Sequence, residues 1–274
     1  EPRAQGLTRL DPTDLGRLVG YDRAPEAKTL RRRLGQLASL SRSDVLLEHL
    51  ARRHLDQHPE QGGMFYIDGH VRAYHGRADL PKAHLARMRI SMPATLETWV
   101  SDQHGDPIFA VVAPPSASTA AEVRRLLPEL RELVGARRTT VVFDRGGWSP
   151  RLFAELEREG FDILTYRKNP PEREPVPAFA DHEVIDDRGV AHSYRLADRN
   201  VRLGYGPKTA RRYFACRQIT RLCDTGHQTA IIATATDPDP GPLAWAMFNR
   251  WREENFFRYM RARFGLDALD TYTV

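Results

Sequence analysis

The stretch TTVVFDRGGWSPRLFAELEREGFDILTYRK, residues 139–168, decides the fold of this chain. Four β-favouring residues, 140–143, lead to a single carboxylate at Asp144, and an Arg-Gly-Gly run then breaks the strand. Ser149 and Pro150 occupy the N-cap and first positions of a following helix. A carboxylate at the mouth of a buried strand, beside a helix start, is where α/β proteins place metal and phosphate chemistry. The alternative is an aspartate that only caps a turn.

A second apolar run ends on an acid within GGMFYIDGHVRAYHG, residues 62–76. An apolar strand enters an Asp-Gly pair at Asp68, and a run of alternating character follows. Asp-Gly between two strand-like runs is typical of a hairpin, so we expect strands at 64–68 and 70–75. The competing interpretation is that Asp68 is a second functional carboxylate.

A third segment, AWAMFNRWREENFFRYMRARFG at residues 244–265, reads as one helix. One stripe of it carries four charged residues, because side chains three and four positions apart share a face: Arg250, Glu254, Arg258 and Arg261. The rest of the circumference is largely aromatic, so we expect a mostly buried helix. A buried Glu254 needs a partner, either a structural ion pair or a metal ion. Glu253 is the rival acid, but its position turns toward the aromatic side.

Together the three segments resemble the DDE transposases of bacterial insertion sequences, whose catalytic domain has the RNase H-like fold. The resemblance covers roughly residues 60–265. In that family the first acid lies on the first strand, the second just after the fourth strand, and a glutamate on a late helix. Asp68, Asp144 and Glu254 stand in that order, and the family's Asp-Arg-Gly after a hydrophobic strand is present.

The helix signature of the family is met in part. Many members have Tyr, two residues, Arg, three residues, Glu, six residues and then Lys. Here Arg250 and Glu254 have the family's spacing, Arg261 replaces the Lys, and Met247 stands at the Tyr position. That part of the signature is therefore absent.

The resemblance implies a metal-dependent reaction on DNA. Cutting and rejoining DNA is an in-line displacement at phosphorus, which two divalent ions can assist. We expect two Mg²⁺ ions, with Mn²⁺ substituting, because Mg²⁺ prefers carboxylate and phosphate oxygens. Asp68 would bridge both ions, whereas Asp144 and Glu254 would each hold one.

Basic residues form a second pattern. Residues 188–221 contain nine Lys and Arg against Asp198 alone, with aromatic residues interleaved, although a solvated surface has the same composition. The predicted DNA contacts are Arg145, Trp148, Lys168, Lys208, Arg211, Arg212, Arg250, Arg258 and Arg261. The alternatives are core packing for Trp148, strand termination for Lys168, and ion pairs with Glu254 for Arg250 and Arg261.

Composition is compatible with these expectations. The chain has 274 residues and a formal net charge of +5, a mild basic bias that suits nucleic acid. Cys216 and Cys223 are not spaced as a usual zinc pair, so we expect reduced thiols. No apolar stretch has membrane length and no leader is evident, so we expect a cytoplasmic, nucleoid-associated protein of bacterial type.

The organisation expected is α/β: an RNase H-like mixed sheet flanked by helices, with a helical N-terminal segment and a β-rich insertion before the last helix. Residues 1–60 are a DNA-end-binding module or a cap, and residues 61–274 form the catalytic domain with an insertion at about 169–240. Regular elements are expected at 11–14, 24–38, 41–58, 95–101, 107–113, 119–134, 139–144, 150–159, 161–167, 218–222 and 228–234. Leu46, Leu47, Leu50 and Leu55 are expected to form the inward stripe of the third helix.

The sequence therefore predicts a DNA transposase that cleaves at element ends and then transfers strands. Its expected partners are double-stranded DNA with terminal inverted repeats and a second copy in the DNA complex. Two alternatives stay open. One is a nuclease of the same fold without a joining step. The other is a truncated, inactive copy that only binds DNA, because the chain begins at Glu1 and ends shortly after Glu254.

Overall fold

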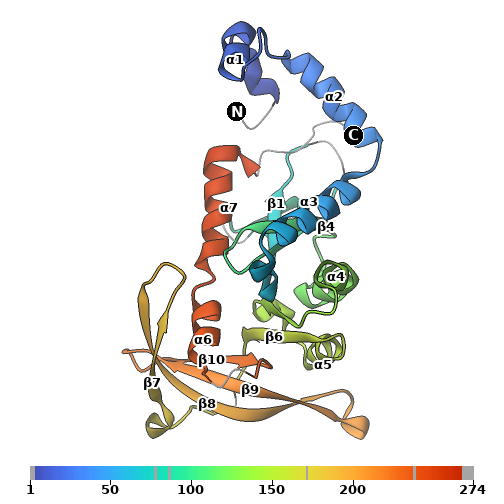
Figure 1. Cartoon of the computed structure of the whole chain (residues 1–274). Helices are drawn as coiled ribbons and strands as arrows, with labels where there is room; N and C mark the ends of the chain where they lie inside the picture. Colours follow the sequence, from blue (N-terminus) through green and yellow to red (C-terminus); the bar gives the residue numbers. More distant parts are fainter. Residues whose placement is uncertain (1–3, 77–78, 86–87, 171, 237–238, 267–274) are drawn as a thin grey trace.

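The fold is a large mixed sheet with helices on both faces and a helical N-terminal arm (Figure 1). The computed structural model describes the following residues, with backbone alone for 4–5 and 251–255: 4–76, 79–85, 88–170, 172–236 and 239–266. The strands are β1 Met64–Ala73, β2 Lys82–Leu85, β3 Ile90–Ser101, β4 Pro107–Ala113, β5 Thr139–Phe143, β6 Phe161–Tyr166, β7 Ala180–Ile185, β8 Ala191–Tyr205, β9 Arg212–Leu222 and β10 Gln228–Ala233.

Seven α-helices and several short 3-10 turns lie in the described part of the chain. The helices are α1 Pro12–Leu18, α2 Ala27–Ser39, α3 Ser43–Gln57, α4 Thr119–Val134, α5 Pro150–Arg158, α6 Gly241–Phe248 and α7 Trp251–Phe264. The 3-10 turns used below are η1 Ala4–Arg9, η3 Arg145–Gly147 and η5 Lys208–Ala210. No helix among the described residues is long and apolar enough to cross a membrane.

The first half of the sheet has the predicted order of elements. Strands β4, β3 and β1 pair antiparallel, and β1, β5 and β6 pair parallel with α4 and α5 as the crossover helices. Three antiparallel strands followed by alternating helices and parallel strands is the order that the RNase H-like resemblance implied. Ser118 and Ser149 cap α4 and α5 through their side-chain oxygens, as such residues do at helix starts.

The expected hairpin at Asp68 is wrong, because β1 is a single strand that continues through the Asp-Gly pair. Residues 66–73 pair continuously with β3, and residues 64–67 pair with β5 on the other side. Pairing on both edges fixes an extended backbone, so the local turn preference of Asp-Gly is overridden. The second expected hairpin, β3–β4, is confirmed.

The predicted β-rich insertion extends the central sheet instead of forming a separate layer. Strand β10 pairs antiparallel with β6, and β9, β8 and β7 follow outward in that order. Only a short strand pair was expected here, whereas β8 alone spans 15 residues. The sheet therefore connects the strands at Asp68 and Asp144 to a long outer hairpin.

Two apolar cores lie on opposite faces of the sheet. The face under α4 and α5 includes the fully buried Phe65, Ile67, Val141 and Phe143. The face under α6 includes Tyr66, Val142, Leu164, Ile219 and Ile231. Alternate residues of β1 and β5 therefore enter different cores, as strand geometry requires. Burial of each such large side chain contributes about 1.5–3 kcal/mol.

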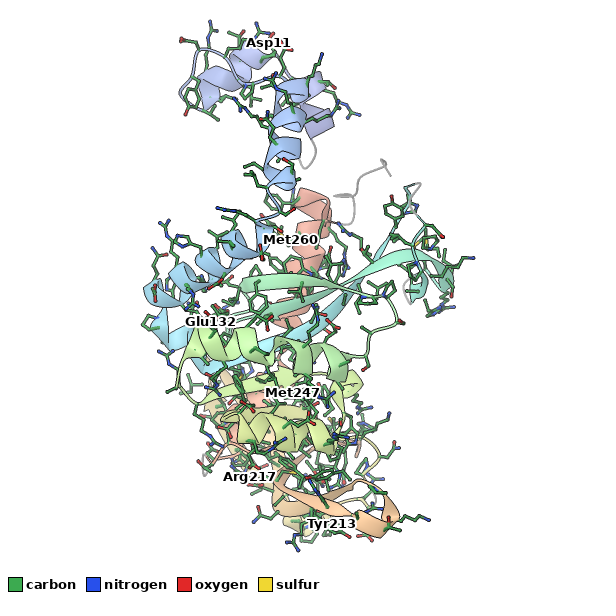
Figure 2. All side chains as sticks on the ribbon, turned by 90° about the vertical axis from the view of Figure 1, so that its right-hand side faces the viewer. Asp11, Glu132, Tyr213, Arg217, Met247 and Met260 are labelled. Carbon is green, nitrogen blue, oxygen red and sulfur yellow. The ribbon has the colours of Figure 1, made fainter. Side chains whose placement is uncertain are left out.

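The N-terminal helices project from this body (Figure 2). Helices were predicted close to where α1, α2 and α3 lie, but the expected inward stripe of α3 is only partly correct. Ala51 is buried and Leu55 packs against the core, whereas Leu46 and Leu50 are exposed. The helix therefore contacts the body through its C-terminal half.

Candidate active site

The two strand acids are brought together by the register of β1 and β5. Tyr66 pairs with Val142, and Ile67 pairs with Phe143. The next position along both strands is an aspartate, Asp68 on β1 and Asp144 just after β5. Parallel neighbours lie about 4.8 Å apart, and residues two apart share a face. Both acids therefore share the face of Tyr66 and Val142, which α6 covers.

Asp144 is held in a tight turn that leaves it partly exposed. Its Oδ1 accepts a hydrogen bond of 2.8 Å from the Gly146 amide, and its carbonyl oxygen accepts one of 3.2 Å from Thr165 Oγ1. A Cβ on Gly146 would lie 2.9 Å from Asp144 Oδ1 and 2.7 Å from Thr119 Oγ1. A side chain at this position would therefore force Thr119 or the Asp144 carboxylate to move.

Asp68 has a cation beside it. Arg250 Nη2 lies 3.5 Å from Asp68 Oδ2, with side-chain exposures of 13% and 32% respectively. The Gly69 amide also donates to Asp68 Oδ1 at 2.9 Å. Arg250, which was predicted on the late helix, therefore contacts Asp68, the first of the three predicted acids.

The late helix is two helices rather than the single helix expected. Helix α6 ends at Phe248, and α7 begins at Trp251. The junction is tied to the sheet, because Tyr66 Oη donates to the Ala246 carbonyl at 3.0 Å and Asn249 Nδ2 donates to Tyr194 Oη at 2.8 Å. These bonds hold the end of α6, and α7 begins again after Asn249 and Arg250.

Helix α7 crosses the acid-bearing face of β1. The Phe257 ring stacks on His70 with centroids 5.1 Å apart, and meets the Trp99 ring edge-on at 5.5 Å. Trp99 pairs directly with Asp68 across β1 and β3. The expectation of a mostly buried helix is only partly correct, because Phe257 is buried while Tyr259 is 56% exposed.

Glu254 falls in α7, but its side chain lies outside what the structure describes, as does that of Glu253. Within the helix, position 254 comes one turn after Arg250 and about one turn before Phe257. Those two residues contact Asp68 and its strand neighbour His70. The position therefore lies on the part of α7 nearest to β1.

A buried polar group beside the acids was missed in the sequence. Glu97, paired with His70 in the sheet, forms an ion pair of 3.0 Å with Arg72 and accepts a 3.2 Å hydrogen bond from Trp99 Nε1. The only sign of this group in the sequence was that polar residues recur at every second position of β1, which places Asp68, His70 and Arg72 on one face. This group fixes the Trp99 ring under α7.

Three predicted DNA-contact residues lie at the same sheet edge as Asp144. Arg145 is exposed next to it, with its guanidinium 5.4 Å from the centre of the Tyr166 ring. Lys168 is exposed just after β6, which runs parallel to β5. Trp148 is partly buried and meets Phe153 edge-on at 5.4 Å, so its ring packs against the core.

The other predicted DNA-contact residues lie on other elements. On α7, Arg258 is exposed and Arg261 is half-buried. The basic segment 188–221 does not form one surface. Several of its arginines are paired with acids: Arg195 with Asp181, Arg199 with Glu174, and Arg217 with Asp198.

Apart from Arg188, which is exposed in the turn between β7 and β8, the exposed remainder of that segment gathers at the η5 end of the β8–β9 hairpin. It comprises Arg202, Lys208, Arg211 and Arg212. In Figure 2 the neighbouring Tyr213 marks this end, which lies far from Asp11 in the N-terminal arm. We call these four residues the hairpin cations.

Comparison with known proteins gives a family. The sequence pattern of the family described as "Transposase protein" matches residues 5–274. A search of curated proteins finds no match. Among solved structures, the chain is similar to a piggyBac transposase in a synaptic complex with hairpin DNA, with 11% identity, 73% of this chain and 40% of that chain covered, and a TM-score of 0.45.

It is also similar to the Mos1 mariner transposase in a paired-end complex with Mn. In that comparison the identity is 11%, 58% of this chain and 56% of that chain are covered, and the TM-score is 0.26. The chain thus spans about half the length of these transposases, or less. Because the family pattern extends over nearly all of its residues, the chain belongs to the transposase protein family.

Proposed function

We propose that this protein is a DNA transposase that cleaves phosphodiester bonds at element ends and then joins strands, in a metal-dependent reaction. The observation that carries the proposal is the register that sets Asp68 and Asp144 side by side on the face crossed by α7. Family membership supports the same reaction class. The catalytic unit would be residues 61–274, including the insertion at about 169–240, whose strands are continuous with the acid-bearing sheet.

Glu254 is proposed as the third carboxylate. Its place in α7 between Arg250 and Phe257, both of which contact the region of β1 around Asp68, supports this choice. Glu253 is one residue earlier, about 100° around the helix, and is the natural comparison.

The donor set suits a hard divalent cation. Two partly exposed carboxylates on adjacent strands, with a third supplied by a helix, offer the oxygen ligands that Mg²⁺ or Mn²⁺ takes. When bound, two such ions activate the attacking oxygen and stabilise the leaving oxygen of an in-line displacement. Asp68 would bridge them, with Asp144 and Glu254 holding one each.

The basic residues around the acids have a substrate-binding role in this proposal. Arg145 and Lys168 would hold DNA phosphates at the edge of the sheet, because both are exposed beside Asp144. Arg250 neutralises Asp68 in the absence of metal and would turn to phosphate once DNA is bound. Arg258 and Arg261 would extend the contact along α7.

The test is cleavage of a DNA fragment that carries the native element ends, with Mg²⁺ or Mn²⁺. We expect metal-dependent nicking at the ends by the wild type, and a loss of at least about 100-fold in Asp68→Asn, Asp144→Asn and Glu254→Gln. Glu253→Gln is the matched control and should retain activity. Circular dichroism and melting temperature would verify that each variant is folded.

The outcomes separate the possible functions. Full activity in any of the three acid variants would show that the substituted residue is not part of the active site. Cleavage without strand joining would identify a nuclease of the same fold. Binding of the ends without cleavage by the wild type would identify a DNA-binding remnant.

A further inference from the structure

Helix α2 of the N-terminal arm has apolar side chains that are not buried. Every residue from 31 to 50 is exposed, and this stretch includes Leu34 at 58% and Leu37 at 64%. Helix α2 contacts η1 at its beginning and otherwise extends away from the body (Figure 1). An isolated helix of 13 residues is marginal in water and gains most of its stability from packing an apolar face.

The charges of α2 are arranged around that apolar face. Leu30, Leu34 and Leu37 fall on one side, since positions four and three apart share a face. Arg31 and Arg33 flank the leucines, whereas Lys28 and Arg32 lie on the opposite side. The helix contains no acidic residue between Ala27 and Ser39. It therefore offers a leucine stripe with a cation on either border.

The body has a groove between α3, β4 and α4 whose walls and border complement this helix. Its walls are apolar, with Leu47 and Ala51 from α3, Phe109 and Val111 from β4 and Leu133 from α4. The space is about 270 Å³, several times the roughly 30 Å³ that one water molecule occupies in the liquid. The groove can therefore receive apolar side chains.

The border of this groove is acidic. Four acids stand around it: Asp44, Glu48, Glu129 and Glu132. One cation is among them, Arg52, which pairs with Glu48 at 2.9 Å and with Glu132 at 2.7 Å. The remaining negative charge is the complement of the α2 flanks, and the apolar walls are the complement of the leucines.

We propose that α2 of one copy docks in the acid-bordered groove of a second copy, and that the exchange is mutual. A mutual exchange closes into a two-fold dimer with two identical contacts, so neither copy keeps a free stripe or a free groove. The leucines would supply the buried area, and the charge pairs would fix the direction and register of the helix.

The occupant is a second copy because α2 and the groove are held apart within one chain. Only Leu40, Ser41 and Arg42 separate α2 from α3, and α2 leaves α3 at its N-terminal end. In Figure 2 the arm extends away from Glu132 at the groove border. DNA would satisfy the arginines but would leave the leucine stripe without an apolar partner.

The experiment uses charge reversal in the full chain, without DNA or metal, followed by sedimentation velocity. One variant reverses the groove, Glu129→Lys with Glu132→Lys. The other reverses the helix flanks, Arg31→Glu with Arg33→Glu. We expect the wild type to dimerise and each variant alone to be monomeric. An equimolar mixture should restore the dimer, because both contacts of the mixed pair are complementary.

Matched controls carry the same charge changes elsewhere. Lys28→Glu with Arg32→Glu reverses the far side of α2, and Glu183→Lys with Asp224→Lys reverses exposed acids of the outer sheet. Both should remain dimeric.

Four results would overturn the proposal. A wild type that stays monomeric up to about 100 μM would exclude a dimer of useful affinity. A mixture that does not dimerise would show that the two surfaces do not meet. A wild-type monomer whose α2 lies in its own groove would show the same. Loss of DNA binding in the helix variant, with the oligomeric state unchanged, would assign α2 to DNA. None of these depends on the proposed cleavage reaction.

Discussion

At the scale of single residues, Asp68 has two competing partners. Arg250 lies 3.5 Å from its carboxylate in the structure, and the proposed metal site requires the same oxygens. A cation within a few ångströms of a metal site opposes the binding of a second positive charge. In the proposed mechanism the ion pair would therefore order the site before metal binds and would weaken the metal affinity.

Arg250→Gln should tighten the binding of Mn²⁺ by about tenfold, because a positive charge next to Asp68 is removed. The readout is the free Mn²⁺ signal in an electron paramagnetic resonance titration, which is independent of cleavage. Arg258→Gln, an exposed arginine two turns further along, is the control and should change little. Weaker Mn²⁺ binding in Arg250→Gln would contradict the competition.

Cys216 provides a pH prediction away from the site. Burial raises the pKa of its thiol to about 12 from 9.0, against an opposing effect of Arg167. The folded state therefore keeps the thiol neutral, and the stability this contributes is complete below pH 9.0 and disappears as the pH rises toward 12. Cys223 is half-buried, and both thiols are free.

Thiol labelling at about pH 8 should modify Cys223 in the folded protein and reach Cys216 only after unfolding, because the thiolate is the reactive form. Cys223→Ser should therefore label only in denaturant. Rapid labelling of that variant under native conditions would contradict the burial of Cys216.

At the scale of elements, the described side chains of α7 contact the sheet chiefly through aromatic rings. Phe257 is 7% exposed and contacts both His70 and Trp99. Phe256 is half-buried and its ring lies 5.8 Å from that of Trp99, whereas Tyr259 and Phe264 are exposed. The placement of α7, and with it the proposed role of Glu254, therefore depends strongly on the Phe257 ring.

Phe257→Ala should lower the free energy of unfolding by about 2–4 kcal/mol, at or below the usual range for a buried aromatic because α7 lies at the edge of the core. At temperatures where the variant is still folded, its cleavage rate should also fall, and by more than the fraction of unfolded protein explains. Urea denaturation and the cleavage assay give the two values. Tyr259→Ala, on the exposed side, should change stability by less than about 0.5 kcal/mol.

Elements with strong local signals were predictable from the sequence. Ser118 and Ser149 cap helices, and the apolar run before Asp144 forms a buried strand, as expected. Elements decided by distant partners were not. The Asp-Gly pair at Asp68 stays extended because two strands flank it, and the late helix breaks where Tyr66 and Tyr194 hold the end of α6.

The placement of the candidate acids was predictable to a similar extent. The identity of both strand acids followed from residue type and place, and the structure sets them next to each other. Their common face follows from the β1–β5 register, which no local pattern contains. Among the described side chains Arg250 pairs with Asp68, and the alternative pair with Glu254 lies outside what the structure describes.

At the scale of the whole molecule, positive charge is divided between distant places. The hairpin cations lie at one end of the sheet, while Arg145 and Lys168 flank the acids. Several arginines of the same segment are paired with acids. Overall charge therefore overstates the number of cations available to DNA.

Neutralising three hairpin cations, in Lys208→Gln with Arg211→Gln and Arg212→Gln, should reduce DNA affinity uniformly across sequences. It should also lower the slope of log K against log salt by about 0.9 for each lost phosphate contact. Fluorescence anisotropy at several salt concentrations measures both. Arg195→Gln, whose guanidinium is paired with Asp181, should leave the slope nearly unchanged. Equal effects of the two changes would contradict the division of charge.

The path of the chain also sets an order in time. The two strand acids can meet once β5 has paired with β1, whereas α7 reaches them only after the strands β7 to β10 have been made and added to the sheet. Translation at about 5–20 residues per second separates these events by roughly 5–20 seconds. We expect ribosome-arrested chains to cut DNA only after α7 has left the exit tunnel, so a half-made protein is harmless to the genome that encodes it.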